Sequence, residues 1–243
     1  MQNKQELEIF RRISDDLNVV FDVGTRDDID YYLIKNDCEY HLFEPNIKFS
    51  KIIKNKIDHI YNPNKKVFIN QIGLSNENVK DAMYYENTES FVEHWQGLSL
   101  DRGHKFDLTT IDDYVEKNNI SKIDFLKTDC EELDFKVLVG GLKTIKYNNS
   151  VKFLQIEYSY ISPIIELFNN FDFYLMMESG LYDAISKITN NQYNNYFNKS
   201  LIKMDKNLIN FLDRVVSPSG IGGNLFGINK NENYDVNKLI FNI

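Results

Sequence analysis

The chain alternates short apolar runs with longer amphipathic stretches. Leu7, Phe10, Ile13 and Leu17 recur at helical spacing, which predicts an amphipathic helix over residues 4–17. Short runs rich in β-branched residues are typical of strands that are covered on both faces. Such runs occur at residues 18–23, 39–44, 66–74, 122–129, 151–158, 171–177 and 222–229. Because helical patterns separate most of them, we predict an α/β fold with a mostly parallel sheet and right-handed crossovers.

Local signals add detail to this pattern. Pro45 and Asn46 precede a helical stretch, and Thr110 stands three residues before Asp113, a capping-box pattern that opens a short helix. Residues 76–108 are polar and irregular, so we expect a long connection there, and connections of that length are often functional. The polar run at residues 190–198 is interpreted as a surface insertion.

The pattern contains no internal repeat and no linker that would divide the chain. We therefore predict a single domain over residues 1–243, with an N-terminal helix at 1–17, a ligand-binding core at 18–158 and a C-terminal part of the sheet at 159–243. A chain of 243 residues is long enough for one large α/β domain.

Composition and charge narrow the possible partners. A net charge of -8 argues against a protein that grips nucleic acid, which needs clustered Lys and Arg. No apolar run approaches the roughly 20 residues that span a bilayer, and the N-terminus has no signal-peptide core. Cys38 and Cys130 are too few for a disulfide framework or a zinc site, so a reducing cytoplasm is the expected location. The oligomeric state is left open.

Candidate ligand-binding residues follow the predicted strands. In open parallel sheets, ligands bind beyond the carboxyl ends of the strands, near the point where the strand order reverses. The expected rim carries five residues from five segments, and four of them are acidic: Asp22, Glu44, Gly73, Asp129 and Glu157.

The first predicted turn, "VVFDVGTRDD", is acidic. Asp22, Asp27 and Asp28 surround Gly24, and Arg26 is the only local cation. Unit charges about 4 Å apart interact by about 4 kcal/mol at a surface-like dielectric, so these aspartates would oppose a pyrophosphate. A ligand that carries an ammonium and a sulfonium beside an adenosine suits them better, and S-adenosylmethionine has these groups.

Glu44 supports the same ligand. It ends the second predicted strand, 22 residues after Asp22, where an acidic side chain can accept both ribose hydroxyls. The alternative is that Asp22 and Glu44 only cap strand ends, and spacing alone does not separate the two interpretations.

Five segments together resemble FkbM-type methyltransferases. They are "VVFDVGTRDD", "HLFEPN", "IGLSN", "LTTIDDY" and "IDFLKTDCEELDFKVLVGG", in the family's order and spacing. The resemblance covers roughly residues 18–158, and residues 108–141 are its most specific part. It implies a class I, Rossmann-like methyltransferase fold with a mostly parallel seven-stranded sheet and helices on both faces. It also implies S-adenosylmethionine as cofactor and methylation of a hydroxyl on a sugar, glycan or similar small metabolite.

The resemblance also implies roles for residues. Asp22, Gly24 and Thr25 would hold the methionine end, Glu44 the ribose, and Leu74 and Ser75 the adenine edge. The other residues predicted to bind the cofactor lie in the same turns and at the end of the fourth predicted strand: Arg26, Asp28, Pro45, Gly73 and Asp129. This sequence departs from the family in two places, with Asp28 at the second turn glycine and Glu132 after the motif glutamate.

The predicted chemistry centres on the family's Lys, Asp and Glu, which Lys127, Asp129 and Glu131 match. We predict that Asp129 removes the acceptor's proton or orients its hydroxyl, supported by Glu131 and Glu157. The alternatives are a divalent cation bound by Asp129, Glu131 and Glu157, which suits hard oxygen ligands, and simple helix capping.

Further alternatives remain open. His94 or His104, in the long connection, would be a possible base. The aromatic residues of that connection either stack on a sugar or pack the loop: Tyr84, Tyr85 and Trp95. Two other functions compete: a degenerate relative that only binds, and an NAD-dependent sugar-modifying enzyme, which the acidic, glycine-poor turn disfavours. The sequence does not identify the acceptor.

Overall fold

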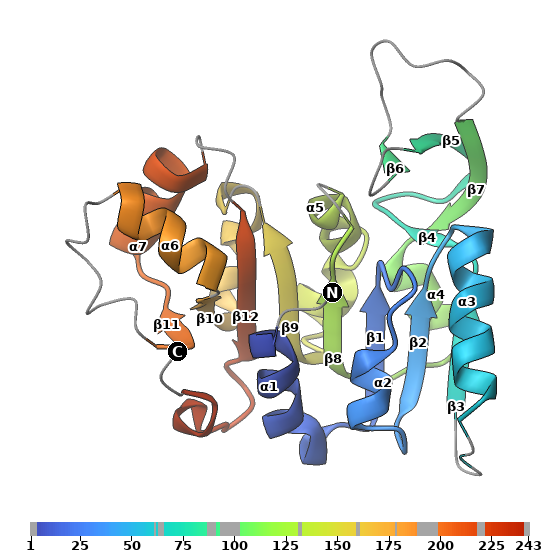
Figure 1. Ribbon diagram of the computed structural model, residues 1–243, viewed down its shortest axis with the longest axis horizontal. Coiled ribbons are helices and arrows are strands. Elements are labelled where there is room, and N and C mark those ends of the chain that lie inside the picture. Colours follow the sequence, from blue (N-terminus) through green and yellow to red (C-terminus); the bar gives the residue numbers. More distant parts are fainter. Residues whose placement is uncertain are drawn as a thin grey trace.

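The computed structural model describes residues 4–60, 62, 66–86, 91–92, 103–130, 133–158, 161–177, 179–188, 199–217 and 222–240 of the chain (Figure 1). The helices are α1 (Lys4–Ile13), α2 (Asp30–Ile34), α3 (Ile47–Asp58), α4 (Ile111–Lys117), α5 (Asp134–Val139), α6 (Ser179–Ile188) and α7 (Lys206–Phe211). The strands are β1 (Val19–Val23), β2 (Glu39–Phe43), β3 (Lys66–Asn70), β4 (Gly73–Leu74), β5 (Val79–Glu86), β6 (Phe91–Val92), β7 (Gly103–Thr109), β8 (Ile123–Thr128), β9 (Val151–Tyr158), β10 (Phe171–Met176), β11 (Leu201–Lys203) and β12 (Gly223–Asn229).

Eight strands form the main sheet, in the order β11-β10-β12-β9-β8-β1-β2-β3. Strands β3, β2, β1, β8 and β9 pair in parallel, whereas β12 pairs antiparallel with both β9 and β10. The order runs outward from β1 to β3 on one side and from β8 to β9 on the other. The topological switch point therefore lies between β1 and β8, where ligands of such sheets bind.

The predicted fold class is confirmed, but the predicted number of seven strands is wrong. The additional strand is the edge strand β11, which pairs antiparallel with β10. Three residues carry too little pattern to predict a strand, and β11 forms because β10 offers it an open edge.

The predicted strand at residues 66–74 is two strands in two different sheets. It ends in the main sheet at Asn70, and β4 then joins a second sheet with the order β4-β7-β5-β6. The prediction of an irregular connection at residues 76–108 is therefore wrong for β5 and for β7, which pair antiparallel. In Figure 1 this small sheet projects beyond the carboxyl ends of the main strands, beside α5.

Helices cover both faces of the main sheet, and each face has its own apolar core. Helices α1, α2 and α3 pack on one face, through residues such as Phe10, Tyr31 and Ile53. Helices α4 to α7 contribute to the core on the other face, through residues such as Ile111 and Leu138. In β1, Val20 belongs to one core and Phe21 to the other. In β8, the neighbours Phe125 and Leu126 divide in the same way, as the pleat of a strand covered on both faces requires.

Two predicted helix starts are confirmed by their caps. The Asn46 side chain accepts a hydrogen bond from Lys48 N at 2.9 Å, and Thr110 Oγ1 accepts one from Asp113 N at 3.0 Å. These bonds satisfy N–H groups that the first turn of a helix leaves without a partner.

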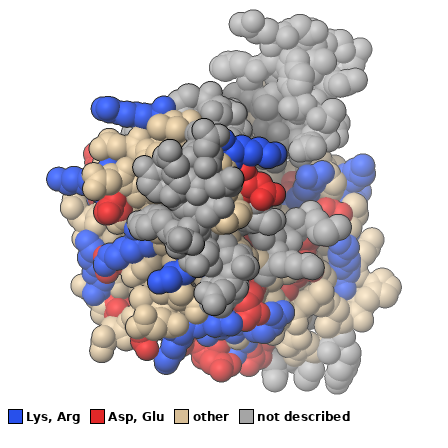
Figure 2. Space-filling model, turned by 60° about the vertical axis from the view of Figure 1, so that its left-hand side comes forward, with Lys and Arg blue, Asp and Glu red and all other residues tan. Residues whose placement is uncertain are grey.

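The surface mixes both signs of charge. On the face that Figure 2 presents, Lys and Arg side chains are interspersed with Asp and Glu outside the grey atoms. Among the described residues, no helix combines the length and the apolar character that crossing a membrane requires. Cys38 and Cys130 are both free thiols.

Candidate functional site

The turn after β1 lies at the switch point and touches the end of β8. Gly24 has a φ of 80°, and a Cβ at this position would lie 1.9 Å from the backbone oxygen of Asp129. The Gly24 N–H donates to Phe43 O at 3.1 Å, and the Asp129 N–H donates to Val23 O at 3.1 Å. The turn is thus held between β2 and β8, and only glycine fits it.

Glu44, at the end of β2, holds this turn. Its Oε2 accepts from Arg26 N and its Oε1 from Asn46 N, both at 2.8 Å. The residue is 5% exposed, and burial raises the pKa of its carboxyl to about 7 although both N–H donors favour the charged form. Each carboxylate oxygen has a second lone pair, so Glu44 can still accept two more hydrogen bonds.

The rest of the turn has local partners. Thr25 Oγ1 donates to Asp22 O at 2.9 Å, and Asp28 Oδ1 accepts from Asp30 N at 2.8 Å at the start of α2. Asp28, which stands where the family has a glycine, therefore helps to begin a helix. The Arg26 side chain is exposed. The cofactor-binding roles predicted for Thr25, Arg26 and Asp28 stay predictions.

A buried lysine lies between two aspartates beside this turn. Lys127 Nζ is 3.0 Å from Asp129 Oδ2 and 3.5 Å from Asp22 Oδ1. Burial acts to lower the pKa of Lys127, but the two carboxylates hold it well above its ordinary value. Burial raises the pKa of Asp22 despite the lysine. For Asp129 the Lys127 charge outweighs burial and holds the pKa below its ordinary value.

The exposure of these side chains separates their roles. The side chains of Lys127 and Asp22 are 2% and 3% exposed, whereas that of Asp129 is 40% exposed. Within this cluster, Asp129 is therefore the group that a substrate can touch. Lys127, predicted as catalytic, is placed to keep Asp129 ionised and oriented.

Glu157 joins the cluster from the neighbouring strand. Its carboxyl forms a hydrogen bond with that of Asp129, and the β8–β9 register places the two residues side by side. This contact acts with Lys127 to hold the pKa of Asp129 below its ordinary value. The structure thus brings Asp129 and Glu157 together as predicted from the rim.

A further carboxylate secures the turn between β8 and α5. Asp134 accepts from Cys130 N at 3.1 and 3.2 Å, and burial raises the pKa of Asp134 to about 6. Asp134 was not among the predicted site residues; its signal in the sequence is its place in the first turn of a helix. It fixes the backbone that directly follows Asp129.

The predicted adenine-edge residues lie at the base of the small sheet. Gly73 and Leu74 pair with β7, and Ser75 N donates to Thr109 O at 2.9 Å. Leu74 and Ser75 are buried, and Pro45 is half-buried beside Glu44. None of the hydrogen bonds or ion pairs given for the described residues joins Gly73, Leu74 or Ser75 to Glu44 or Asp129.

The small sheet contains two residues for which the sequence left a functional role open, Tyr84 and His104. Tyr84 is 3% exposed and its ring stacks on Phe106 at 4.7 Å, so it packs the small sheet rather than offering a face to a sugar. His104 lies exposed on β7. Glu131, His94 and Trp95 lie outside the described residues. Within the described part of the chain, no group of three or more His, Cys, Asp or Glu is arranged to hold a metal ion.

Sequence reasoning missed a polar network beneath α1 and α2. Glu6 of α1 accepts from Tyr31 Oη at 3.2 Å and from Gln155 Nε2 at 3.0 Å through Oε2, and from Asn224 Nδ2 at 2.8 Å through Oε1. Glu6 and Gln155 are 6% and 1% exposed. The available signal is that Glu6 precedes Ile9 by three positions and so shares its face of the helix.

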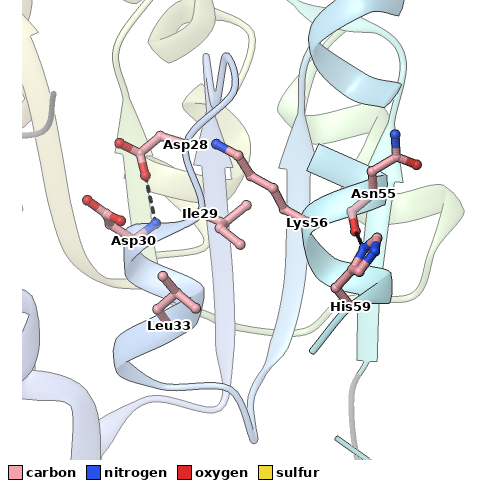
Figure 3. A pocket seen from close by; sticks show the side chains of 7 residues that line it. All are labelled: Asp28, Ile29, Asp30, Leu33, Asn55, Lys56 and His59. Atoms are coloured by element: carbon pink, nitrogen blue, oxygen red, sulfur yellow. Dashed lines mark hydrogen bonds between the residues drawn. The ribbon is translucent and has the colours of Figure 1, made fainter. Parts of the chain in front are cut away.

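A surface groove of about 610 Å³ lies next to the turn that follows β1 but outside the carboxyl edge of the sheet. Figure 3 shows it between the start of α2 and the last turns of α3. Its polar groups have local partners: Lys56 Nζ donates to Asp27 O, and the His59 ring bonds Asn55 O at 2.5 Å. Because Asp129 and Glu44 do not line it, we place the candidate active site at the switch point instead.

The chain matches a known protein family. Residues 22–183, more than half of the chain, match the family model of the methyltransferase FkbM domain. A crystal structure of a methyltransferase FkbM from Methylobacillus flagellatus KT is similar at 16% sequence identity and a TM-score of 0.44, over 63% of this chain and 36% of that one. No curated protein matches the chain.

Proposed function

Because this chain belongs to the methyltransferase FkbM family, we propose that it is an S-adenosylmethionine-dependent O-methyltransferase that acts on a hydroxyl of a sugar, glycan or similar small metabolite. The observation that carries the proposal is the carboxylate of Asp129. It is kept ionised by a buried lysine and is partly exposed, and the backbone of Asp129 lies against the glycine turn at the switch point.

The residues present fit the cofactor. Gly24 lets the turn pack directly against the backbone of Asp129, and Glu44 has two free acceptor positions for two ribose hydroxyls. Asp22 and Asp129 together carry more negative charge than Lys127 neutralises. This excess favours a ligand with a sulfonium and an ammonium over one with a diphosphate. Gly24, Thr25 and Asp22 would hold the methionine end.

The proposed mechanism assigns the proton to Asp129. When bound, S-adenosylmethionine supplies an electrophilic methyl group whose departure leaves a neutral thioether. The acceptor hydroxyl donates a hydrogen bond to Asp129, which takes the proton as the oxygen becomes the ether. Lys127 and the Glu157 carboxyl hold Asp129 in place for this transfer. Positioning of the acceptor supplies much of the rate, because alignment alone is worth about 7–11 kcal/mol.

The first experiment tests the cofactor. We expect the thermal unfolding temperature of the protein to rise with S-adenosylhomocysteine and to stay unchanged with NAD. The reverse result would favour the NAD-dependent alternative and overturn the proposal.

The second experiment tests the reaction. A panel of sugars is offered with methyl-labelled S-adenosylmethionine to the wild type, Asp129→Asn and Glu116→Gln, which removes an exposed carboxylate elsewhere. We expect transfer by the wild type and by Glu116→Gln, and a fall of about 10²–10⁴-fold in Asp129→Asn with unchanged cofactor affinity. Full turnover in Asp129→Asn refutes its role as base. Cofactor binding without transfer to any hydroxyl compound would favour the binding-module alternative.

A further inference from the structure

Four polar side chains from four elements meet beneath the candidate site. Glu6 of α1 accepts hydrogen bonds from Tyr31 of α2, Gln155 of β9 and Asn224 of β12. Two of these residues, Glu6 and Asn224, lie outside the segment 22–183 that matches the family model. The network beneath the candidate site therefore includes residues on both sides of the segment that matches the family model.

The network is continuous with the lysine of the active site. Gln155 is the register neighbour of Lys127 on the adjacent parallel strand, so the two side chains leave the same face of the sheet side by side. Both are buried. The charge of Glu6 acts on Lys127 together with those of Asp22 and Asp129.

A carboxylate suits the centre of this network better than an amide. Three donors converge on the two oxygens of Glu6, and a glutamine would offer one acceptor oxygen and turn its own NH₂ toward a donor. A polar group that is buried against the wrong partner is costly, so the surrounding side chains would have to turn. The first to turn would be Tyr31 and Gln155, and Gln155 is the register neighbour of Lys127.

We propose that Glu6 is a positioning residue of the methyl-transfer site, which acts through Tyr31 and Gln155 to hold Lys127 and, through Lys127, the Asp129 carboxylate. This inference rests on the proposed function. It makes α1 part of the working enzyme although the helix lies outside the family domain, and it assigns no contact with substrate to Glu6.

The test compares two glutamates of the same helix. Glu6→Gln changes the network, whereas Glu8→Gln changes a half-buried residue that, among the ion pairs of α1, pairs with Arg11 and Arg12. We expect Glu6→Gln to lower kcat by about 10- to 100-fold per folded molecule, as a small displacement of a reacting group does, and to change the Kd of S-adenosylhomocysteine much less. Glu8→Gln should equal the wild type.

Rescue distinguishes positioning from simple stability. The double variant Glu6→Gln, Gln155→Glu returns a carboxylate to the network, because Tyr31 Oη already lies 3.3 Å from Gln155 Oε1. We expect it to recover most of the lost kcat. Tyr31→Phe, which removes one hydroxyl from the network, should lower kcat by a smaller factor. It keeps the inference testable if Glu6→Gln does not fold.

The outcomes are separable. If the wild type neither binds S-adenosylhomocysteine nor transfers a methyl group, the proposed function fails. If the wild type is active and folded Glu6→Gln, or Tyr31→Phe in its place, has the kcat of Glu8→Gln, the positioning role is overturned. A folded double variant that is no more active than Glu6→Gln also overturns it.

Discussion

Glu44 links the proposed cofactor site to pH. Its carboxyl is buried with a pKa of about 7, and the two hydroxyl donors of a ribose would bind its ionised form. Only the molecules with ionised Glu44 can bind the cofactor, so the apparent affinity for the cofactor falls in proportion to the ionised fraction. At pH 6 about one molecule in eleven is ionised, so S-adenosylhomocysteine should bind about tenfold more weakly at pH 6 than at pH 8.

Glu44 also makes folding stability depend on pH, and this dependence has the opposite sign to that of cofactor binding. The folded protein keeps the Glu44 proton up to about pH 7, whereas the unfolded chain releases it near the ordinary value of 4.5. The contribution of Glu44 to folding stability is therefore fully present below pH 4.5 and is lost as pH rises through 7. At about 1.4 kcal/mol per pKa unit, the loss amounts to about 3 kcal/mol.

Calorimetric titration with S-adenosylhomocysteine at pH 6, 7 and 8 checks the binding prediction. The comparison uses the wild type, Glu44→Gln and the surface control Glu116→Gln. We expect Glu44→Gln to bind about 10- to 100-fold more weakly at pH 8, since a hydrogen bond to a charged group is worth about 1.5–3 kcal/mol, and to show a flat pH profile. A wild-type affinity that does not change from pH 6 to pH 8, or a Glu44→Gln variant that keeps the wild-type profile, would refute the reasoning.

Further predictions concern the switch point. Gly24→Ala should lose cofactor binding and unfold at lower denaturant concentration, because its methyl group would lie 1.9 Å from the Asp129 backbone; a variant with wild-type binding in calorimetry would show that the turn can move. Lys127→Met should lose about 3–5 kcal/mol in urea unfolding, because Asp22 and Asp129 are left without their cation, and an unchanged midpoint would contradict the buried ion pairs. Asp134 makes the folded protein more stable as pH falls through 6, and Asp134→Asn should remove this rise in stability. Thermal unfolding between pH 5 and pH 8 measures it. A variant with the wild-type pH dependence would show that the pKa of Asp134 is not about 6.

The sequence was sufficient for the features that local pattern controls. The apolar runs predicted β1, β2, β8 and β9. The ends of the predicted strands placed Glu44 and Asp129 at the same edge of the sheet. Their parallel register follows from the α/β alternation. The cap of α4 was predictable because Thr110 and Asp113 are three residues apart and their bond forms within one helical turn.

The rest depends on contacts between distant segments. In α1, Leu7 is half-buried against the core as its spacing indicates, but the buried stripe of the helix also passes through Glu6, whose partners are 25 to 218 residues away. The small sheet was missed for the same reason. Its strands β5 and β7 carry many exposed residues, and they pair with each other across a segment whose pattern gives no register.

The position of β12 has a consequence for synthesis of the chain. This strand is the last of the sheet in sequence, yet it lies between β9 and β10 and hydrogen-bonds both. A nascent chain that stops before residue 223 would therefore present two unsatisfied strand edges in the middle of its sheet, and exposed edges invite pairing with other chains. We expect C-terminal deletions to give aggregates instead of weakened enzymes, and nascent chains to need protection from each other until the final strand arrives.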